Sequence, residues 1–165
     1  MSTLYVDSIQ PKTTGQAITV ASTNQTGHVL QVVQNTSTTG ATISSDSFVT
    51  TGFAATITPK FATSKLLLTV NVFITTVNGG QGSVNIYSSA DSSLVTSNTY
   101  GFGGFYAAGG SGSYESINSI NFLTNAVGST ASRTYTLYGK NTGSDPAYFL
   151  NSSRLSTFTI TEIGG

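Results

Sequence analysis

The stretch that decides the fold is Leu66-Leu67-Leu68-Thr69-Val70-Asn71-Val72-Phe73-Ile74. In an extended segment successive side chains point to opposite faces, so every second residue shares a face. One face of this segment is entirely apolar: Leu66, Leu68, Val70, Val72 and Ile74. The other face is mixed: Leu67, Thr69, Asn71, Phe73 and Thr75. Because both faces carry apolar residues, the pattern predicts a long central strand that is partly buried on both sides.

Shorter strand signals recur along the rest of the chain, whereas apolar residues at helical spacing do not. Strands are expected at 28–34, 47–50, 53–58, 83–89, 93–97, 114–124, 133–139, 147–150 and 155–163. Many short strands separated by turn-rich segments predict an all-β fold, an antiparallel β-sandwich that is jelly-roll-like. Ile117 and Ile120 cannot share one face of a regular strand, so a β-bulge is expected between them.

The length of 165 residues fits one domain with a short extension. Residues 1–25 form a polar stretch with isolated strand-like pieces, which predicts an extended N-terminal arm ahead of a sandwich domain at 26–165. The apolar residues of the arm are expected to bind a partner: Leu4, Tyr5, Val6 and Ile9. The alternative is a first strand followed by a disordered connection, and the sequence leaves both open.

A second segment, 98–113, is the longest glycine-rich stretch of the chain. Glycine leaves its backbone conformationally free, while aromatic side chains offer large contact areas. The segment carries four aromatic residues that are candidates for receptor contact: Tyr100, Phe102, Phe105 and Tyr106. The alternative is a flexible crossover whose aromatic rings cover the edge of the core.

Charged residues make up only 7% of the chain, where about 25% is usual. The formal net charge is +0 and no basic patch forms, which argues against nucleic-acid binding. A surface of such low charge does little to prevent association, so we expect permanent partners to cover it. The chain has no cysteine, its first residues do not form a signal peptide, and its most apolar run, 66–74, is too short for membrane insertion.

Motifs that carry chemistry are missing from the sequence. His28 is the single histidine, and it alone makes neither a zinc site nor a Ser-His-Asp triad. The segment 109–113 resembles a nucleophile elbow but ends in serine instead of glycine, and 101–104 fails the dinucleotide fingerprint. Nothing selects a catalytic pair among the acidic residues, and Asp91 and Asp145 fit turn positions. We therefore expect no catalytic residue, no metal, no cofactor and no enzymatic activity.

Six segments, taken in order, carry a likeness to known proteins: 1–10, 27–33, 48–59, 64–68, 135–140 and 158–163. Through them the chain resembles small β-rich virion structural proteins of marine tailed bacteriophages, cyanophages especially. The likeness covers most of the chain except about 79–113. It implies a location in the virion, tail or capsid proteins as partners, and a homotrimer, because such proteins are commonly trimeric.

The resemblance and the low charge together favour a trimeric tail-fibre or adhesin subunit. Its arm would anchor it, and the segment 98–113 would contact host surface glycans. The main alternative is a capsid decoration protein, a cement or head-fibre protein that binds the assembled shell. A glycan depolymerase is a more distant alternative, and a secreted lectin is disfavoured because a signal sequence is missing.

Overall fold

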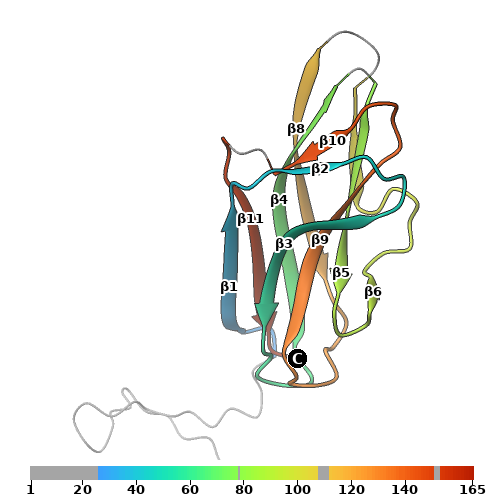
Figure 1. Ribbon diagram of the computed structural model, residues 1–165. Coiled ribbons are helices and arrows are strands. Elements are labelled where there is room, and N and C mark those ends of the chain that lie inside the picture. Colours follow the sequence, from blue (N-terminus) through green and yellow to red (C-terminus); the bar gives the residue numbers. More distant parts are fainter. Residues whose placement is uncertain (1–25, 78, 108–111, 151–152) are drawn as a thin grey trace, which may run out of the picture.

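The computed structural model describes residues 26–77, 79–107, 112–150 and 153–165. These residues form a sandwich of two β-sheets, and no helix occurs among them (Figure 1). The strands are β1 (Val29–Ser37), β2 (Ala41–Ile43), β3 (Val49–Ile57), β4 (Lys65–Val77), β5 (Gln81–Ser88), β6 (Ser93–Leu94), β7 (Gly103–Tyr106), β8 (Ser113–Leu123), β9 (Arg133–Asn141), β10 (Ala147–Phe149) and β11 (Ser156–Ile163).

The strand order is that of a jelly roll. In the first sheet the central strand β4 pairs with β8 along one edge. Along its other edge β4 pairs with β11 and then with the short β10. Strand β1 lies on the outer side of β11, and β2 lies on the outer side of β10. In the second sheet the order is β3-β9-β5-β6, and β7 also pairs with β5. All these pairings are antiparallel, and the chain crosses between the sheets from β1 to β3, β4 and β5 in turn. The expected antiparallel, jelly-roll-like β-sandwich is confirmed.

Strand β4 is the centre of the first sheet, as its alternation predicts. Its inward side chains are fully buried: Leu66, Leu68, Val70, Val72 and Ile74. Side chains from the second sheet meet them, so that both sheets contribute to one core. Phe158 on β11 packs edge-on against Phe53 on β3, with ring centroids 6.0 Å apart, and this contact joins the two layers directly.

Three details differ from the expectations. The segments 47–50 and 53–58 belong to one strand, β3, whose pairing with β9 shifts register between Thr50 and Ala54, where Gly52 has a φ of +79°. The bulge expected in 114–124 is wrong, because β8 pairs with β4 in an unbroken register from Leu123 to Ser113. Ile117 instead points outward and is 60% exposed. Strands β2 and β7 are further additions, and β7 lies inside the glycine-rich segment 98–113.

A buried carboxylate closes the end of the core next to the 58–61 turn. Glu162 on β11 is inaccessible to solvent, and it accepts hydrogen bonds from Gln31 Nε2 at 2.5 Å, the Lys60 amide at 2.7 Å and the Phe61 amide at 3.3 Å. Burial by itself raises the pKa of this carboxyl, but the Ser64 hydroxyl, the Gln31 amide and the two backbone N–H groups outweigh it. The pKa of Glu162 is therefore lowered from its ordinary value.

Replacing Glu162 by glutamine should lower the free energy of unfolding at pH 7 by about 1–3 kcal/mol, because the amide cannot accept all these bonds. The folded-state pKa of Glu162 is lowered, so its contribution is complete above the ordinary carboxyl pKa of about 4.3 and is lost as the pH falls below it. Urea unfolding at several pH values measures this. The variant should lose part of the acid-induced destabilisation, while the exposed control Asp46→Asn should keep all of it. Equal acid sensitivity in Glu162→Gln and the parent would contradict this role.

Candidate functional site

No group of three or more His, Asp or Glu side chains that could hold a metal occurs within 26–77, 79–107, 112–150 and 153–165. His28 is exposed beside β1, and the elbow-like segment 109–113 lies partly outside the described residues. The described part of the chain also contains no helix long and apolar enough to cross a membrane. That the protein is not an enzyme stays a prediction.

The candidate partner-binding residues of the arm, Leu4, Tyr5, Val6 and Ile9, lie outside the described residues. Their role stays a prediction. The part of the chain that follows the arm is held firmly to the sandwich. The Gly27 amide donates to the Gly164 carbonyl at 2.7 Å, and the Gly164 amide donates to the His28 carbonyl at 2.9 Å. A force on the arm would therefore be transmitted to the two adjacent strands β1 and β11.

The segment between β6 and β7 folds back over the outer face of the second sheet. The Val95 amide donates to the Ile86 carbonyl at 2.7 Å, and the Phe102 amide donates to the Val84 carbonyl at 2.9 Å. The buried Asn85 side chain donates from Nδ2 to the carbonyl of residue 96 at 2.8 Å. The structure thus ties the segment 95–102, which leads into the glycine-rich stretch, to β5 at three points.

The four aromatic candidates of segment 98–113 divide into two pairs. Tyr100 and Tyr106 are 53% and 58% exposed. Phe102 and Phe105 are half-buried and pack against the core, and the Phe102 ring meets the Phe122 ring edge-on with centroids 5.5 Å apart. Two of the four rings therefore cover the core edge, and the other two are free to contact a partner.

Lys140 fixes the position of Tyr100, and sequence reasoning did not single it out. This lysine is 5% exposed, and its Nζ lies 5.0 Å from the centroid of the Tyr100 ring and 5.1 Å from that of Phe48. It also donates a hydrogen bond to the Thr99 carbonyl. A desolvated cation between two aromatic faces stabilises this loop conformation. Alternation along β9 places Lys140 on an outward face, but only the folded loop shows what covers it.

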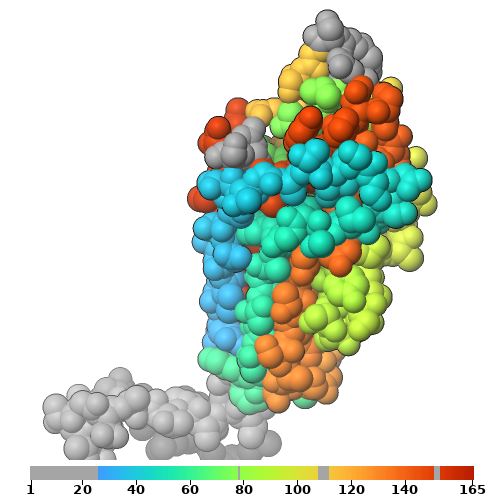
Figure 2. Space-filling view, in the orientation of Figure 1, coloured from blue at the N-terminus to red at the C-terminus, as the bar shows by residue number. Residues whose placement is uncertain are grey.

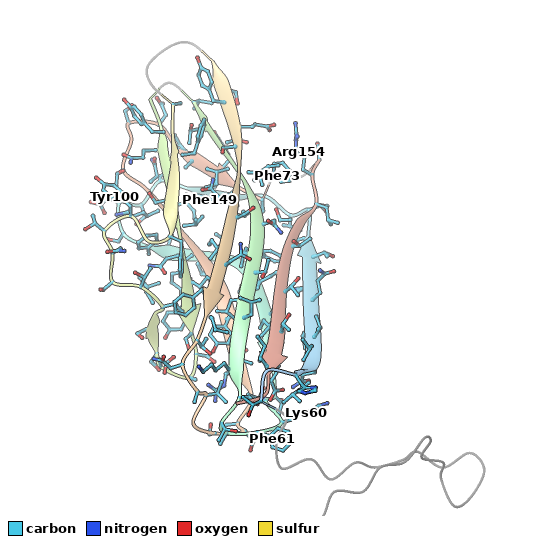
Figure 3. All side chains as sticks on the ribbon, turned by 180° about the vertical axis from the view of Figure 1, so that it is seen from behind. Lys60, Phe61, Phe73, Tyr100, Phe149 and Arg154 are labelled. Atoms are coloured by element: carbon cyan, nitrogen blue, oxygen red, sulfur yellow. The ribbon has the colours of Figure 1, made fainter. Side chains whose placement is uncertain are left out.

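The outer face of the first sheet is nearly free of charge. Figure 3 shows this face, with β8, β4, β11 and β1 side by side. Its outward residues on these strands are Val32, Gln34, Thr36, Lys65, Leu67, Thr69, Asn71, Phe73, Thr75, Val77, Ser113, Glu115, Ile117, Ser119, Asn121, Leu123, Thr157, Thr159, Thr161 and Ile163. Two of these residues are charged, Lys65 and Glu115, and they stand near opposite ends of β4. Arg154, from the segment before β11, adds a third charge, because its guanidinium lies 5.2 Å from the centroid of the outward Phe73 ring and bonds to Glu115. Around Asn71 and Ser119 the strands carry no charged side chain of their own.

Polar side chains on this face bond to one another across the strands. Ser119 Oγ donates to Asn71 Oδ1 at 2.7 Å, and Asn71 Nδ2 donates to Thr157 Oγ1 at 3.3 Å, which links β8, β4 and β11. Gln34 Nε2 donates to Thr159 Oγ1 at 2.9 Å. Because each of these side chains already has a partner, covering them with a second surface costs less than covering unpaired polar groups.

The two edges of the first sheet differ in how they are protected. At β1 side chains bridge to the second sheet: Asn35 Nδ2 donates to the Ala54 carbonyl at 2.7 Å, and Gln31 Nε2 donates to the Thr58 carbonyl at 2.8 Å. Strand β8 pairs on one side with β4, and no other described strand pairs with it. It has eleven residues, no bulge and one charged side chain, Glu115, which is bound by Arg154 at 2.9 Å. A long, regular edge of this kind favours pairing with another chain.

The view of Figure 2 is onto the opposite side, the outer face of the second sheet, where β3 and β9 lie side by side. Tyr87 and Tyr138 stack here with centroids 5.1 Å apart. The strand β3 carries the register shift at Gly52, and the 94–102 segment covers part of β5 and β9. This face is thus more irregular than that of the first sheet, which is the better candidate for a flat interface.

No protein-family model and no curated protein matches the sequence. Solved structures with a similar fold include the T13 particle of infectious bursal disease virus, at 17% identity and a TM-score of 0.47, covering 96% of this chain and 40% of that chain. The VP2 subviral particle of the same virus matches at 17% identity and a TM-score of 0.44, covering 80% and 37%. The chain spans less than half the length of these proteins, and the likeness concerns the fold alone.

Proposed function

We propose that this protein is a virion structural protein, the subunit of a homotrimeric tail fibre or adhesin that its N-terminal arm anchors to the particle. The observation that carries the proposal is the nearly uncharged, internally hydrogen-bonded outer face of the first sheet beside the unprotected edge of β8. The resemblance of the sequence to small phage virion proteins supports the same conclusion.

The outer face of the first sheet and the edge of β8 are better suited to permanent burial in an interface than to exposure to solvent. A stable interface buries about 1,600 Å² in total, or about 800 Å² from each partner, which is a small share of the 9484 Å² surface of this chain. Burial of the exposed apolar side chains on this face would add to the free energy of association: Val32, Ile117 and Leu123 are 57%, 60% and 50% exposed. Ile117 and Leu123 belong to β8 itself, so the edge and the apolar patch coincide.

A three-fold ring uses both features at once. When the β8 edge of one subunit contacts the outer face of the first sheet in the next subunit, the contact is heterologous, and it forms a ring when the rotation between subunits closes. Three subunits arranged in this way would direct the first sheets toward the axis and leave the second sheets, with Tyr100, on the outside. In that arrangement the exposed Tyr100 and Tyr106 contact host surface glycans.

Point substitutions test the adhesin role better than removal of the whole segment. Deleting 98–113 would also remove β7 and the core-packing Phe102 and Phe105, so any effect would be structural. Phage particles carrying Tyr100→Ser and Tyr106→Ser together should adsorb to host cells at least about tenfold more slowly, since each ring can contribute about 1 kcal/mol of contact.

The control for this experiment is Phe61→Ser, an exposed ring that Figure 3 places at the far end of the sandwich from Tyr100. It should leave adsorption unchanged. If the double variant adsorbs like the parent while the particles stay intact, the tyrosines are not the receptor contact. The capsid decoration alternative would then be favoured, because it needs adhesion to the shell and no receptor.

A further inference from the structure

A cavity of about 290 Å³ lies where the end of β8, the start of β9 and strand β6 meet. Its lining residues come from all three places and from the turns beside them: Asp91, Ser93, Leu94, Val95, Phe122, Thr124, Asn125, Ala126, Val127, Arg133 and Tyr135. Polar side chains and apolar side chains both contribute to its walls.

The polar wall contains a buried arginine with unused donors. Arg133 is 6% exposed, and its Nη2 donates to the Val127 carbonyl and to the carbonyl and hydroxyl of Ser129, each at 3.1 Å. Its Nε has no hydrogen-bond partner, and no described carboxylate forms a salt bridge with it. The Nε atom is itself buried, but a guanidinium has five N–H donors and none of these bonds uses Nη1, so the Nη1 donors remain for a molecule in the cavity that Arg133 lines.

Tyr135 and Asp91 complete this polar wall. Tyr135 is 3% exposed, and burial raises the pKa of its hydroxyl against the opposing influence of Arg133, so the hydroxyl keeps its proton at neutral pH. Asp91 Oδ2 accepts a hydrogen bond from Ser88 Oγ at 2.6 Å, which orients the carboxylate. The wall thus offers donors from Arg133 and Tyr135 and an acceptor from Asp91.

The apolar wall is formed by Phe122 with Leu94, Val95 and Val127. Phe122 also packs against Phe102, whose ring meets it edge-on at an interplanar angle of 65°. Val95 is held by the hydrogen bond from its amide to the Ile86 carbonyl. An aromatic ring held in this way presents a preformed surface to the C–H groups of a ligand.

We propose that this cavity binds one neutral pyranose unit, a monosaccharide or a single residue of a glycan chain. The hydroxyl groups of the sugar would bond to Asp91, Arg133 and Tyr135, and its C–H face would contact Phe122. Asp91 and Arg133 carry opposite charges, so the polar wall as a whole favours an uncharged ligand over an acid. The site is separate from Tyr100 and Tyr106, and either proposal can fail without the other.

Saturation-transfer NMR of the full-length chain with glucose, galactose, mannose, N-acetylglucosamine and glucuronate, each titrated singly, tests this. At least one of the neutral sugars should bind saturably with a Kd on the order of 1 mM. Asp91→Ala should weaken that binding at least tenfold, and Asn125→Ala, which alters an exposed lining residue, should weaken it less. The matched control Asp46→Ala, in the turn after β2, should leave the Kd unchanged.

Thermal melts of each variant establish that the fold is intact. Saturable binding to none of the neutral sugars would overturn the proposal, as would Asp91→Ala binding like the parent. A preference for glucuronate over all neutral sugars would also overturn it, because the cavity would then be an anion site built around Arg133. None of these results bears on whether the protein resides in the virion, which is measured on particles.

Discussion

Replacing Phe158 by alanine should lower the free energy of unfolding by about 3–5 kcal/mol, the largest stability effect that we expect from one substitution. The ring is inaccessible to solvent, and it meets Phe53 of the facing sheet edge-on at 67°. Its removal costs the burial of an aromatic side chain and opens a cavity between the two layers, because neither sheet can collapse into the space.

Urea unfolding followed by circular dichroism measures this loss. The control is Phe61→Ala, the same change at a ring that is 47% exposed, and it should shift stability by no more than about 0.5 kcal/mol. Comparable losses in the two variants would mean that the sheets do not pack through Phe158 and Phe53.

Introducing a charge at the centre of the first sheet's outer face should dissociate the homotrimer that we propose. Ser119 lies on the edge strand β8, opposite Asn71, and donates to it at 2.7 Å. In the proposed assembly Ser119→Lys would place three unpaired ammonium groups at subunit interfaces, and burial of an unpaired charge costs several kcal/mol. We expect self-association at least about 100-fold weaker, with the subunit still folded.

Light scattering coupled to size-exclusion chromatography distinguishes the states, with a trimer expected for the parent and a monomer for the variant. Thr56→Lys, on the exposed outer face of the second sheet, is the matched control and should remain trimeric. A monomeric parent, or a trimer that survives Ser119→Lys and dissociates with Thr56→Lys, would contradict the assignment of the interface to the first sheet.

Much of the fold could be predicted because it depends on local alternation. The five apolar residues of one face in 66–74 are all buried, and nine of the eleven strands begin close to a predicted segment. The strands β2 and β7 cannot be predicted from the sequence, because their own side chains do not alternate clearly. Their extended conformation depends on pairing with other strands, β2 with β10 and β7 with β5. The bulge prediction is wrong because it assumes that Ile117 must be buried like Ile120. Ile117 is instead an exposed apolar residue on a regular edge strand.

Less of the candidate site could be predicted, since it is assembled from segments far apart in sequence. Arg133, Lys140 and Glu162 are buried charged residues, and nothing in their own neighbourhoods indicates it. The sequence predicts a turn position for Asp91, and only the fold brings this residue near Tyr135. The sequence does not divide the four aromatic residues of 98–113, but pairing of β7 with β5 turns Phe105 toward the core and leaves Tyr106 exposed.

The measurement that tests the central claim most directly is immunogold electron microscopy of intact phage particles with an antibody raised against the folded sandwich domain. The proposed function predicts gold on the particles, at the tail or its fibres. Gold distributed over the head would mean that the protein is a capsid decoration protein and not an adhesin. Particles without gold, while the same antibody detects the protein in infected-cell lysate, would contradict the claim that it is a virion structural protein.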